Sequence, residues 1–167
     1  MPAEMQQKTL PLFVRGEVVK GFGRGSKSLG IPTANYPEDV INSLPESLNT
    51  GVYYGWASLN GDQVYKMVLS VGWNPFFKNT KKSMETHIIH TFAQDFYGSE
   101  LRVCITGYIR QESTFPSMDS LIEAIQNDIR IAKEELDKPE HQAYNSHAFL
   151  TDKSLTQKSE VILGCAS

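Results

Sequence analysis

Two short segments of this chain combine residue types that could handle phosphate groups. The first, residues 21–35, reads GFGRGSKSLGIPTAN and joins a basic, glycine-rich loop to a stiff Pro-Thr-Ala-Asn stretch. Glycines such as Gly21 let backbone N–H groups approach a ligand closely, while Arg24 and Lys27 supply positive charge. The loop therefore suits a polyanion, although the glycines alone are equally typical of a mobile turn before a strand.

The Pro-Thr-Ala-Asn stretch places two neutral oxygen donors two residues apart. Pro32 favours extended geometry, and in an extended segment Thr33 and Asn35 project to the same side. A hydroxyl and an amide oxygen are too weak to hold a divalent cation alone, and Mg²⁺ prefers to share phosphate oxygens. We therefore expect a metal ion here to arrive together with a nucleotide.

Known phosphate-binding loops do not account for the glycine-rich segment. The chain has no G-x-x-x-x-G-K-[ST] sequence, and Ser26 stands where the dinucleotide fingerprint needs its third glycine. The catalytic-loop and metal-binding aspartate motifs of protein kinases are also missing. The segment is thus none of the common phosphate loops.

The second chemical segment is Glu-Thr-His-Ile at residues 85–88. Glu85 is the sole acid between Gln63 and Gln94. Such a carboxylate commonly forms a surface ion pair, but one that faces a cavity can accept a proton from an alcohol attacking a γ-phosphoryl group. Strand alternation sends His87 and His90 to opposite faces, which argues against a shared metal ion.

The segment before Glu85, residues 72–83, carries three aromatic residues and three lysines. One interpretation is a flap that covers a planar ligand, with lysines near phosphate. The other is a loop packed by its own aromatic side chains, with solvated charges. Composition alone leaves both interpretations open.

Short strands with turn signals between them make up most of the chain. The predicted strands are residues 12–19, 51–59, 63–71, 84–92 and 101–108. No helical crossover separates neighbours, so the pattern predicts a small antiparallel β-barrel. Apolar residues at three-to-four spacing then predict one amphipathic helix from an N-cap at Ser117 to a stop before Pro139, with its apolar face toward the barrel.

Length and composition indicate one domain over residues 1–167, with a core at about 11–138 and a peripheral tail at 139–167 that holds at most a short helix near 142–150. The chain has 167 residues, a net charge of −3 and a pI near 5.8, which argues against a nucleic-acid partner. No apolar run reaches the length of a membrane span, and the two cysteines form no CxxC. We expect a cytoplasmic monomer.

Taken together, GFGRGSKSLGIPTAN, Gly51-Val52-Tyr53-Tyr54-Gly55-Trp56-Ala57, Ser70-Val71-Gly72-Trp73-Asn74-Pro75, Glu85-Thr86-His87-Ile88 and Asp95-Phe96-Tyr97-Gly98 resemble the riboflavin kinase family in its monofunctional eukaryotic form. The resemblance covers about residues 11–138. It implies a six-stranded antiparallel Greek-key β-barrel with a C-terminal helix. It also implies transfer of the γ-phosphoryl group of ATP to the ribityl 5′-hydroxyl of riboflavin, giving FMN and ADP.

The resemblance also implies roles for single residues. Glu85 would be the catalytic carboxylate, and Thr33 and Asn35 would hold Mg²⁺, or another divalent cation such as Zn²⁺. The implied nucleotide contacts are Gly21, Lys27, Thr33, Asn35, Ile88, His90 and Tyr97, and the implied flavin contacts are Arg110, Ser113 and Phe115. Phe115 could equally be a hydrophobic staple at the helix start. One alternative is a non-catalytic flavin carrier. Another is a nucleic-acid-binding barrel, although the acidic pI argues against it.

Overall fold

The computed structural model describes residues 9–19, 33–73, 82–92, 96–152 and 160–163. Its main feature is one antiparallel seven-stranded sheet with the order β2-β5-β4-β3-β6-β1-β7. The strands are β1 (Leu12–Glu17), β2 (Ala34–Asn35), β3 (Gly51–Leu59), β4 (Val64–Trp73), β5 (Lys82–Ile88), β6 (Glu100–Arg110) and β7 (Glu160–Leu163). The mainly β fold class is confirmed.

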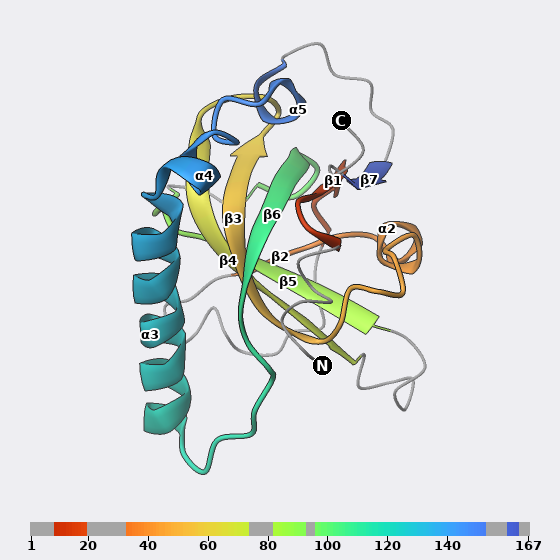
Figure 1. The fold of residues 1–167 in the computed structure, drawn as a ribbon. Coiled ribbons are helices and arrows are strands. Elements are labelled where there is room, and N and C mark those ends of the chain that lie inside the picture. Colours follow the sequence, from red (N-terminus) through yellow and green to blue (C-terminus); the bar gives the residue numbers. More distant parts are fainter. Residues whose placement is uncertain (1–8, 20–32, 74–81, 93–95, 153–159, 164–167) are drawn as a thin grey trace.

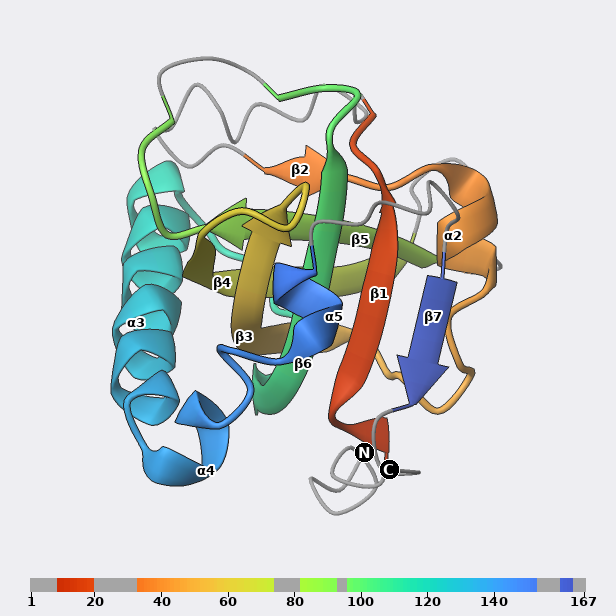
Figure 2. The same cartoon turned by 90° about the horizontal axis from the view of Figure 1, so that it is seen from above.

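The sheet curls back on itself so that the chain just after β1 reaches β2, and Figures 1 and 2 show the curled sheet from two directions. An isolated bridge joins Val19, just past β1, to Asn35 in β2, and the Val19 N–H donates to the Asn35 carbonyl at 2.9 Å. This bridge closes a ring of six strands, and β7 pairs with β1 outside it. The observed count therefore exceeds the predicted six by one strand, which comes from the C-terminal tail.

Strand boundaries agree best with the prediction where both faces of a strand are buried. β3 spans residues 51–59 as predicted, because its side chains pack alternately into the barrel interior and against the outer helices. β5 ends at Ile88 rather than at residue 92. The chain bends there because the rings of His90 and Phe92 pack beside Tyr65, with centroid distances of 4.2 Å from His90 to Tyr65 and 5.6 Å from Phe92 to Tyr65.

The amphipathic helix α3 (Met118–Leu136) lies along the outer face of the sheet and contacts β3, β4 and β6 (Figure 1). Ser117 is its N-cap, as predicted, and forms a capping box with Ser120. Ala132 and Leu136 are fully buried in a second apolar cluster between sheet and helix. A short helix that the sequence did not signal, α2 (Glu38–Asn42), follows β2. No described helix has the length and apolar character needed to cross a membrane.

The described parts of residues 139–163 pack onto the barrel, which differs from the peripheral tail that the sequence predicts. This segment forms α4 (Pro139–Gln142), α5 (Ala148–Thr151) and β7. Leu150 is fully buried, and the Trp56 indole N–H donates to the His141 carbonyl at 2.9 Å. The sequence of this segment does not predict the packing, because its apolar residues show only weak periodicity. A few isolated contacts hold the segment in place instead of a continuous apolar face.

The anchor at His141 predicts a pH-dependent stability. Burial lowers the pKa of His141 from its ordinary 6.5, against an opposing effect of Glu140 and Glu135. The folded state favours the neutral ring. As the pH falls below about 6.5, the unfolded chain therefore binds more protons than the folded chain, and the free energy of unfolding decreases in that range. We expect the melting temperature of the wild type to fall more steeply between about pH 7.5 and pH 5.5 than that of His141→Gln. Parallel pH profiles in differential scanning calorimetry would contradict this expectation.

Candidate active site

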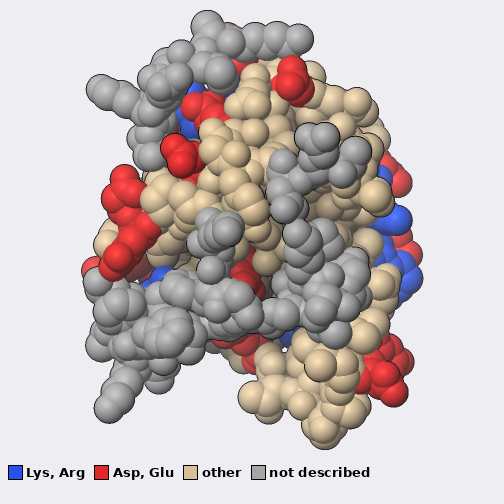
Figure 3. All heavy atoms as spheres, turned by 180° about the vertical axis from the view of Figure 1, so that it is seen from behind, with Lys and Arg blue, Asp and Glu red and all other residues tan. Residues whose placement is uncertain are grey.

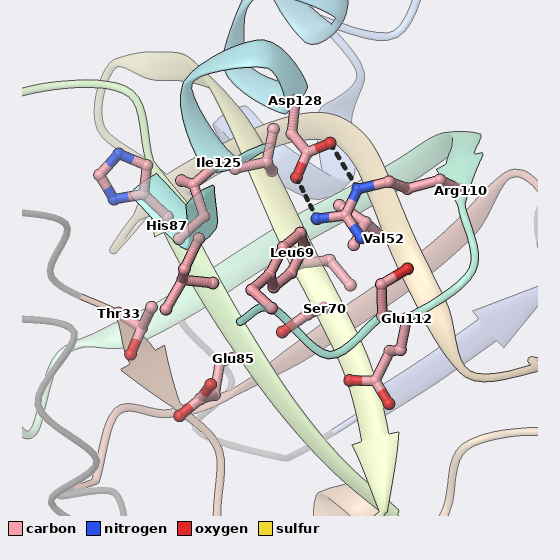
Figure 4. A pocket seen from close by; sticks show the side chains of 14 residues that line it. Thr33, Val52, Leu69, Ser70, Glu85, His87, Arg110, Glu112, Ile125 and Asp128 are labelled. Carbon is pink, nitrogen blue, oxygen red and sulfur yellow. Dashed lines mark hydrogen bonds and ion pairs between the residues drawn. The ribbon is translucent and has the colours of Figure 1, made fainter. Parts of the chain in front are cut away.

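A cavity of about 290 Å³ opens on the outer face of the sheet, between β4, β5, the segment after β6 and α3. Figure 4 shows Thr33 and Glu85 at one end of it and the pair formed by Arg110 and Asp128 at the other. Fourteen residues line the cavity: Thr33, Val52, Val68, Leu69, Ser70, Glu85, His87, Arg110, Glu112, Ser113, Phe115, Leu121, Ile125 and Asp128. Polar groups thus sit at both ends of a cavity whose middle and helix side are largely apolar.

The register of the sheet explains how residues distant in sequence reach this cavity. Asn35 pairs with Glu85, Glu85 with Ser70, Ser70 with Val52, and Val52 with Arg110. Directly paired residues project to the same face of a sheet. These five residues therefore form one lateral row across five strands, on the face that α3 covers.

The structure brings together the three residues on which the phosphate-transfer prediction depends. Thr33 and Glu85 line the same cavity, and Asn35 stands directly opposite Glu85 in the β2–β5 ladder. All three side chains are partly exposed, so a ligand can reach them. Figure 4 shows the Glu85 and Thr33 side chains at the same end of the cavity.

The residue after Asn35 fixes this short strand to the barrel. Tyr36 is 5% exposed, and its hydroxyl lies 2.8 Å from the Leu101 carbonyl and 3.2 Å from the Val14 carbonyl. Burial raises the pKa of Tyr36, so the hydroxyl remains a donor. Gly16 makes room for the ring, since a Cβ at Gly16 would lie 3.0 Å from Tyr36 Cδ1. Tyr36 thereby positions the Thr-Ala-Asn stretch.

We expect Tyr36→Phe to lower the free energy of unfolding by about 1 kcal/mol, because the buried carbonyls lose their donor. Urea denaturation measures the loss. Tyr97→Phe is the matched control, since Tyr97 is 49% exposed and its hydroxyl can bond to water in both states. Equal unfolding free energies for Tyr36→Phe and the wild type would show that this hydroxyl anchors nothing.

The predicted flavin contacts Arg110, Ser113 and Phe115 all line the cavity, and Arg110 lies at the end opposite Glu85 (Figure 4). The Arg110 guanidinium lies over the Phe115 ring, 5.6 Å from its centroid. Arg110 also pairs with Asp128 of α3. This end of the cavity therefore offers an aromatic ring, a flat cation and an apolar helix face.

Apart from Thr33 and Asn35, the predicted nucleotide contacts that the structure describes are not among the residues that line the cavity. Ile88 is buried in the barrel core, His90 stacks on Tyr65 beyond the end of β5, and Tyr97 is exposed in the turn before β6. Gly21 and Lys27 lie outside the described residues, as do residues 74–81 of the aromatic and lysine-rich loop. Of that loop, Trp73 is exposed and Lys82 lies over its ring at 5.9 Å.

Four further polar residues at the cavity, His87 among them, were missed by the sequence reasoning. Ser70 sits between Glu85 and Val52 in the lateral row. Glu112 lies close to Gly72 of β4: a Cβ added at Gly72 would be only 2.5 Å from the Glu112 Oε1 atom. Asp128 occurs in the apolar stripe of α3. A charged residue within that stripe was the one feature of the sequence that could have indicated a functional role.

The oxygen atoms of Thr33, Asn35 and Glu85 suit a metal ion only if phosphate oxygens complete its coordination. Among the described residues, no group of three or more His, Cys, Asp or Glu side chains could hold a metal ion. The Thr33 hydroxyl and the Asn35 amide oxygen are hard, neutral donors next to one carboxylate. Mg²⁺ typically takes one or two protein ligands plus phosphate oxygens and water, so these residues fit a nucleotide-bound cation.

Comparisons with known proteins show the family to which this chain belongs. The family model described as "Flavokinase: Riboflavin kinase" matches residues 8–136. Riboflavin kinase from Mus musculus is 63% identical over 134 residues, covering 80% of this chain and 86% of the relative. Riboflavin kinase from Homo sapiens is 64% identical over 132 residues, covering 79% and 85%.

A solved structure agrees as well. The crystal structure of riboflavin kinase from Trypanosoma brucei superimposes with a TM-score of 0.69 at 28% identity, covering 90% of this chain and 96% of that one. These matches define a phosphotransferase that acts on an alcohol group. The chain belongs to the riboflavin kinase family, and the resemblance read from its motifs is confirmed. The flavin-carrier alternative is not favoured.

Proposed function

We propose that this chain transfers the γ-phosphoryl group of ATP to the ribityl 5′-hydroxyl of riboflavin, giving FMN and ADP, with Glu85 as the catalytic carboxylate. The observation that supports this assignment is the shared location of Thr33 and Glu85 in one cavity, with Asn35 directly opposite Glu85 in the sheet. Phosphoryl transfer needs alignment and charge neutralisation more than covalent help. Neutral oxygens beside one carboxylate supply such an environment.

Glu85 takes up the proton of the acceptor alcohol. As the 5′-oxygen forms its bond to the γ-phosphorus, the bond from that phosphorus to the bridging oxygen of ADP breaks, and the hydroxyl proton passes to the Glu85 carboxylate. Ser70, the cross-strand neighbour of Glu85, lies on the side of the cavity from which the alcohol would approach. The carboxylate therefore also orients the hydroxyl before transfer.

Thr33 and Asn35 would hold a divalent cation, Mg²⁺ or a substitute such as Zn²⁺, together with nucleotide phosphates. When bound, such an ion neutralises the charge of the phosphate oxygens. The protein's own contribution is to fix the two oxygens beside Glu85, through the β2–β5 pairing and the Tyr36 anchor. Gly21 and Lys27 of the glycine-rich loop would complete the nucleotide site.

The nucleotide and the flavin would approach Glu85 from different directions, one along β5 and the other across the strands. Ile88, His90 and Tyr97 lie toward and beyond the C-terminal end of β5, which suits the nucleoside side. The lateral row from Glu85 to Arg110 spans three strand spacings, or about 14 Å, which is long enough for a sugar alcohol chain followed by a fused ring system. Arg110, Ser113 and Phe115 would then contact the flavin ring.

The surface also supports small-molecule substrates over a nucleic-acid partner. On the face in Figure 3, acidic and basic side chains are interspersed among the described residues, without a continuous basic patch. The net charge is −3. We extend the proposal to a single domain over residues 1–167, because the described part of the tail packs on the same barrel as residues 11–138. We also propose a cytoplasmic monomer, as the small size and ordinary composition of the chain suggest.

The direct test mixes the purified chain with riboflavin, ATP and Mg²⁺ and separates the flavins by chromatography. We expect stoichiometric formation of FMN and ADP, and no FMN when the metal is chelated. Omission of ATP is the control. If riboflavin stays bound but no FMN forms, the catalytic assignment fails and a carrier function is favoured.

A further inference from the structure

Asp128 is an unexpected residue in α3. The helix turns an apolar stripe toward the sheet, and position 128 falls within it, between Ile125 and Ala132. The Asp128 side chain is only 4% exposed. Placing a carboxylate there removes it from water at a large cost in free energy, so its partner needs explanation.

That partner is Arg110 at the end of β6, held in a two-pronged geometry. Arg110 Nε donates to one carboxylate oxygen of Asp128 at 2.9 Å, and Arg110 Nη2 donates to the other at 2.8 Å. Arg110 Nη1 donates to the Gln111 carbonyl at 3.1 Å. Three of the five guanidinium N–H donors are thus used, and the plane of the group is fixed.

The fixed guanidinium lies at the flavin end of the cavity. The Arg110 side chain is 28% exposed, and its flat face lies over the Phe115 ring. Within the part of the chain that the structure describes, the other two N–H donors have no protein acceptor, so they are available to a ligand. Figure 4 shows Asp128 and Glu112 on opposite sides of the guanidinium. Asp128 therefore holds Arg110 without occupying the space that Arg110 borders.

Helix attachment alone does not account for the pair. Exchanging a buried ion pair for apolar residues of similar size is often neutral or stabilising, so an apolar pair could join α3 to β6 equally well. What only the ion pair provides is a guanidinium with a defined plane and direction. A flexible Arg110 would have to be ordered each time a ligand bound, which weakens binding.

We propose that Asp128 is a positioning residue for flavin recognition, which fixes the Arg110 guanidinium against the planar, carbonyl-bearing ring of the substrate. This inference rests on the proposed function of the same cavity. It assigns to α3 a part in substrate selection. Asp128 itself acts through Arg110 and does not take part in phosphoryl transfer.

The test is a double-mutant cycle of Asp128→Asn and Arg110→Gln. We expect Asp128→Asn to raise the KM for riboflavin about tenfold, as for the loss of a charged hydrogen-bonded pair, with little change in kcat or in the KM for ATP. In the Arg110→Gln background the same change should have no further effect on the KM for riboflavin. Glu134→Gln is the control, because it breaks an exposed carboxylate–arginine pair (2.9 Å to Arg130) on the same helix.

Two outcomes would overturn the inference. One is an unchanged KM for riboflavin in folded Asp128→Asn, and the other is an equal rise in both backgrounds. If Asp128→Asn does not fold, the double variant Asp128→Leu/Arg110→Met restores apolar packing. It should fold and bind riboflavin weakly, and wild-type affinity in this variant would also overturn the inference.

Riboflavin binding is measured separately by the quenching of flavin fluorescence. This measurement needs no turnover. A wild type that binds riboflavin without making FMN would contradict the proposed function. The binding constants of the same variants would still decide the role of Asp128.

Discussion

Glu85→Gln should lower kcat by about two to four orders of magnitude, the range typical for loss of a general base. The amide has almost the same size as the carboxylate but cannot accept the proton of the 5′-hydroxyl. Because the change affects a group that acts mainly during transfer, the KM values for riboflavin and ATP should change little. Steady-state kinetics with chromatographic detection of FMN measures both quantities.

Glu123→Gln is the matched control for this prediction. It makes the same chemical change on an exposed position of α3 and should leave kcat within about twofold of the wild type, as expected for a surface substitution. Near-normal turnover of Glu85→Gln would remove Glu85 from the catalytic role. A large rise in both KM values with unchanged kcat would instead assign it to ground-state binding.

Arg102→Met should lower the free energy of unfolding by about 3–5 kcal/mol, the cost of breaking a buried ion pair. Arg102 is 1% exposed and lies 2.6 Å from Glu100, which is itself largely buried. It also donates to the Phe149 carbonyl at 3.1 Å and to the Asp152 carbonyl. Methionine fills a similar volume but removes the donors that Arg102 provides to the carboxylate and to the two carbonyls.

The loss should be concentrated in the tail. Ser58, the cross-strand neighbour of Arg102, donates to the Leu150 carbonyl at 2.6 Å, so the two residues together clamp α5 to the barrel. Amide exchange should therefore speed up most in residues 148–152. Arg130→Met is the control, because Arg130 and its partner Glu134 are 59% and 63% exposed and such pairs contribute little. Equal unfolding free energies for Arg102→Met and Arg130→Met would contradict the clamp.

Local patterns predicted the elements whose stability is decided locally. β3 has the predicted limits, because a run that is buried on both faces is apolar throughout. α3 begins at the predicted N-cap and ends before Pro139, since capping and three-to-four spacing act within one or two turns. The tail was missed, because its order depends on contacts such as that between Arg102 and α5, about fifty residues apart.

The sequence by itself determined the family and the chemistry at hand: the Thr33 hydroxyl, the Asn35 amide and one carboxylate, Glu85, in a stretch otherwise without acids. The tertiary structure decided which of these groups meet. Antiparallel pairing sets Asn35 opposite Glu85 and continues the row to Arg110, and a shift by one residue would turn every side chain of a strand to the other face. Register, and the folding of α3 over that row, depend on the packing of the whole barrel, which no single segment encodes.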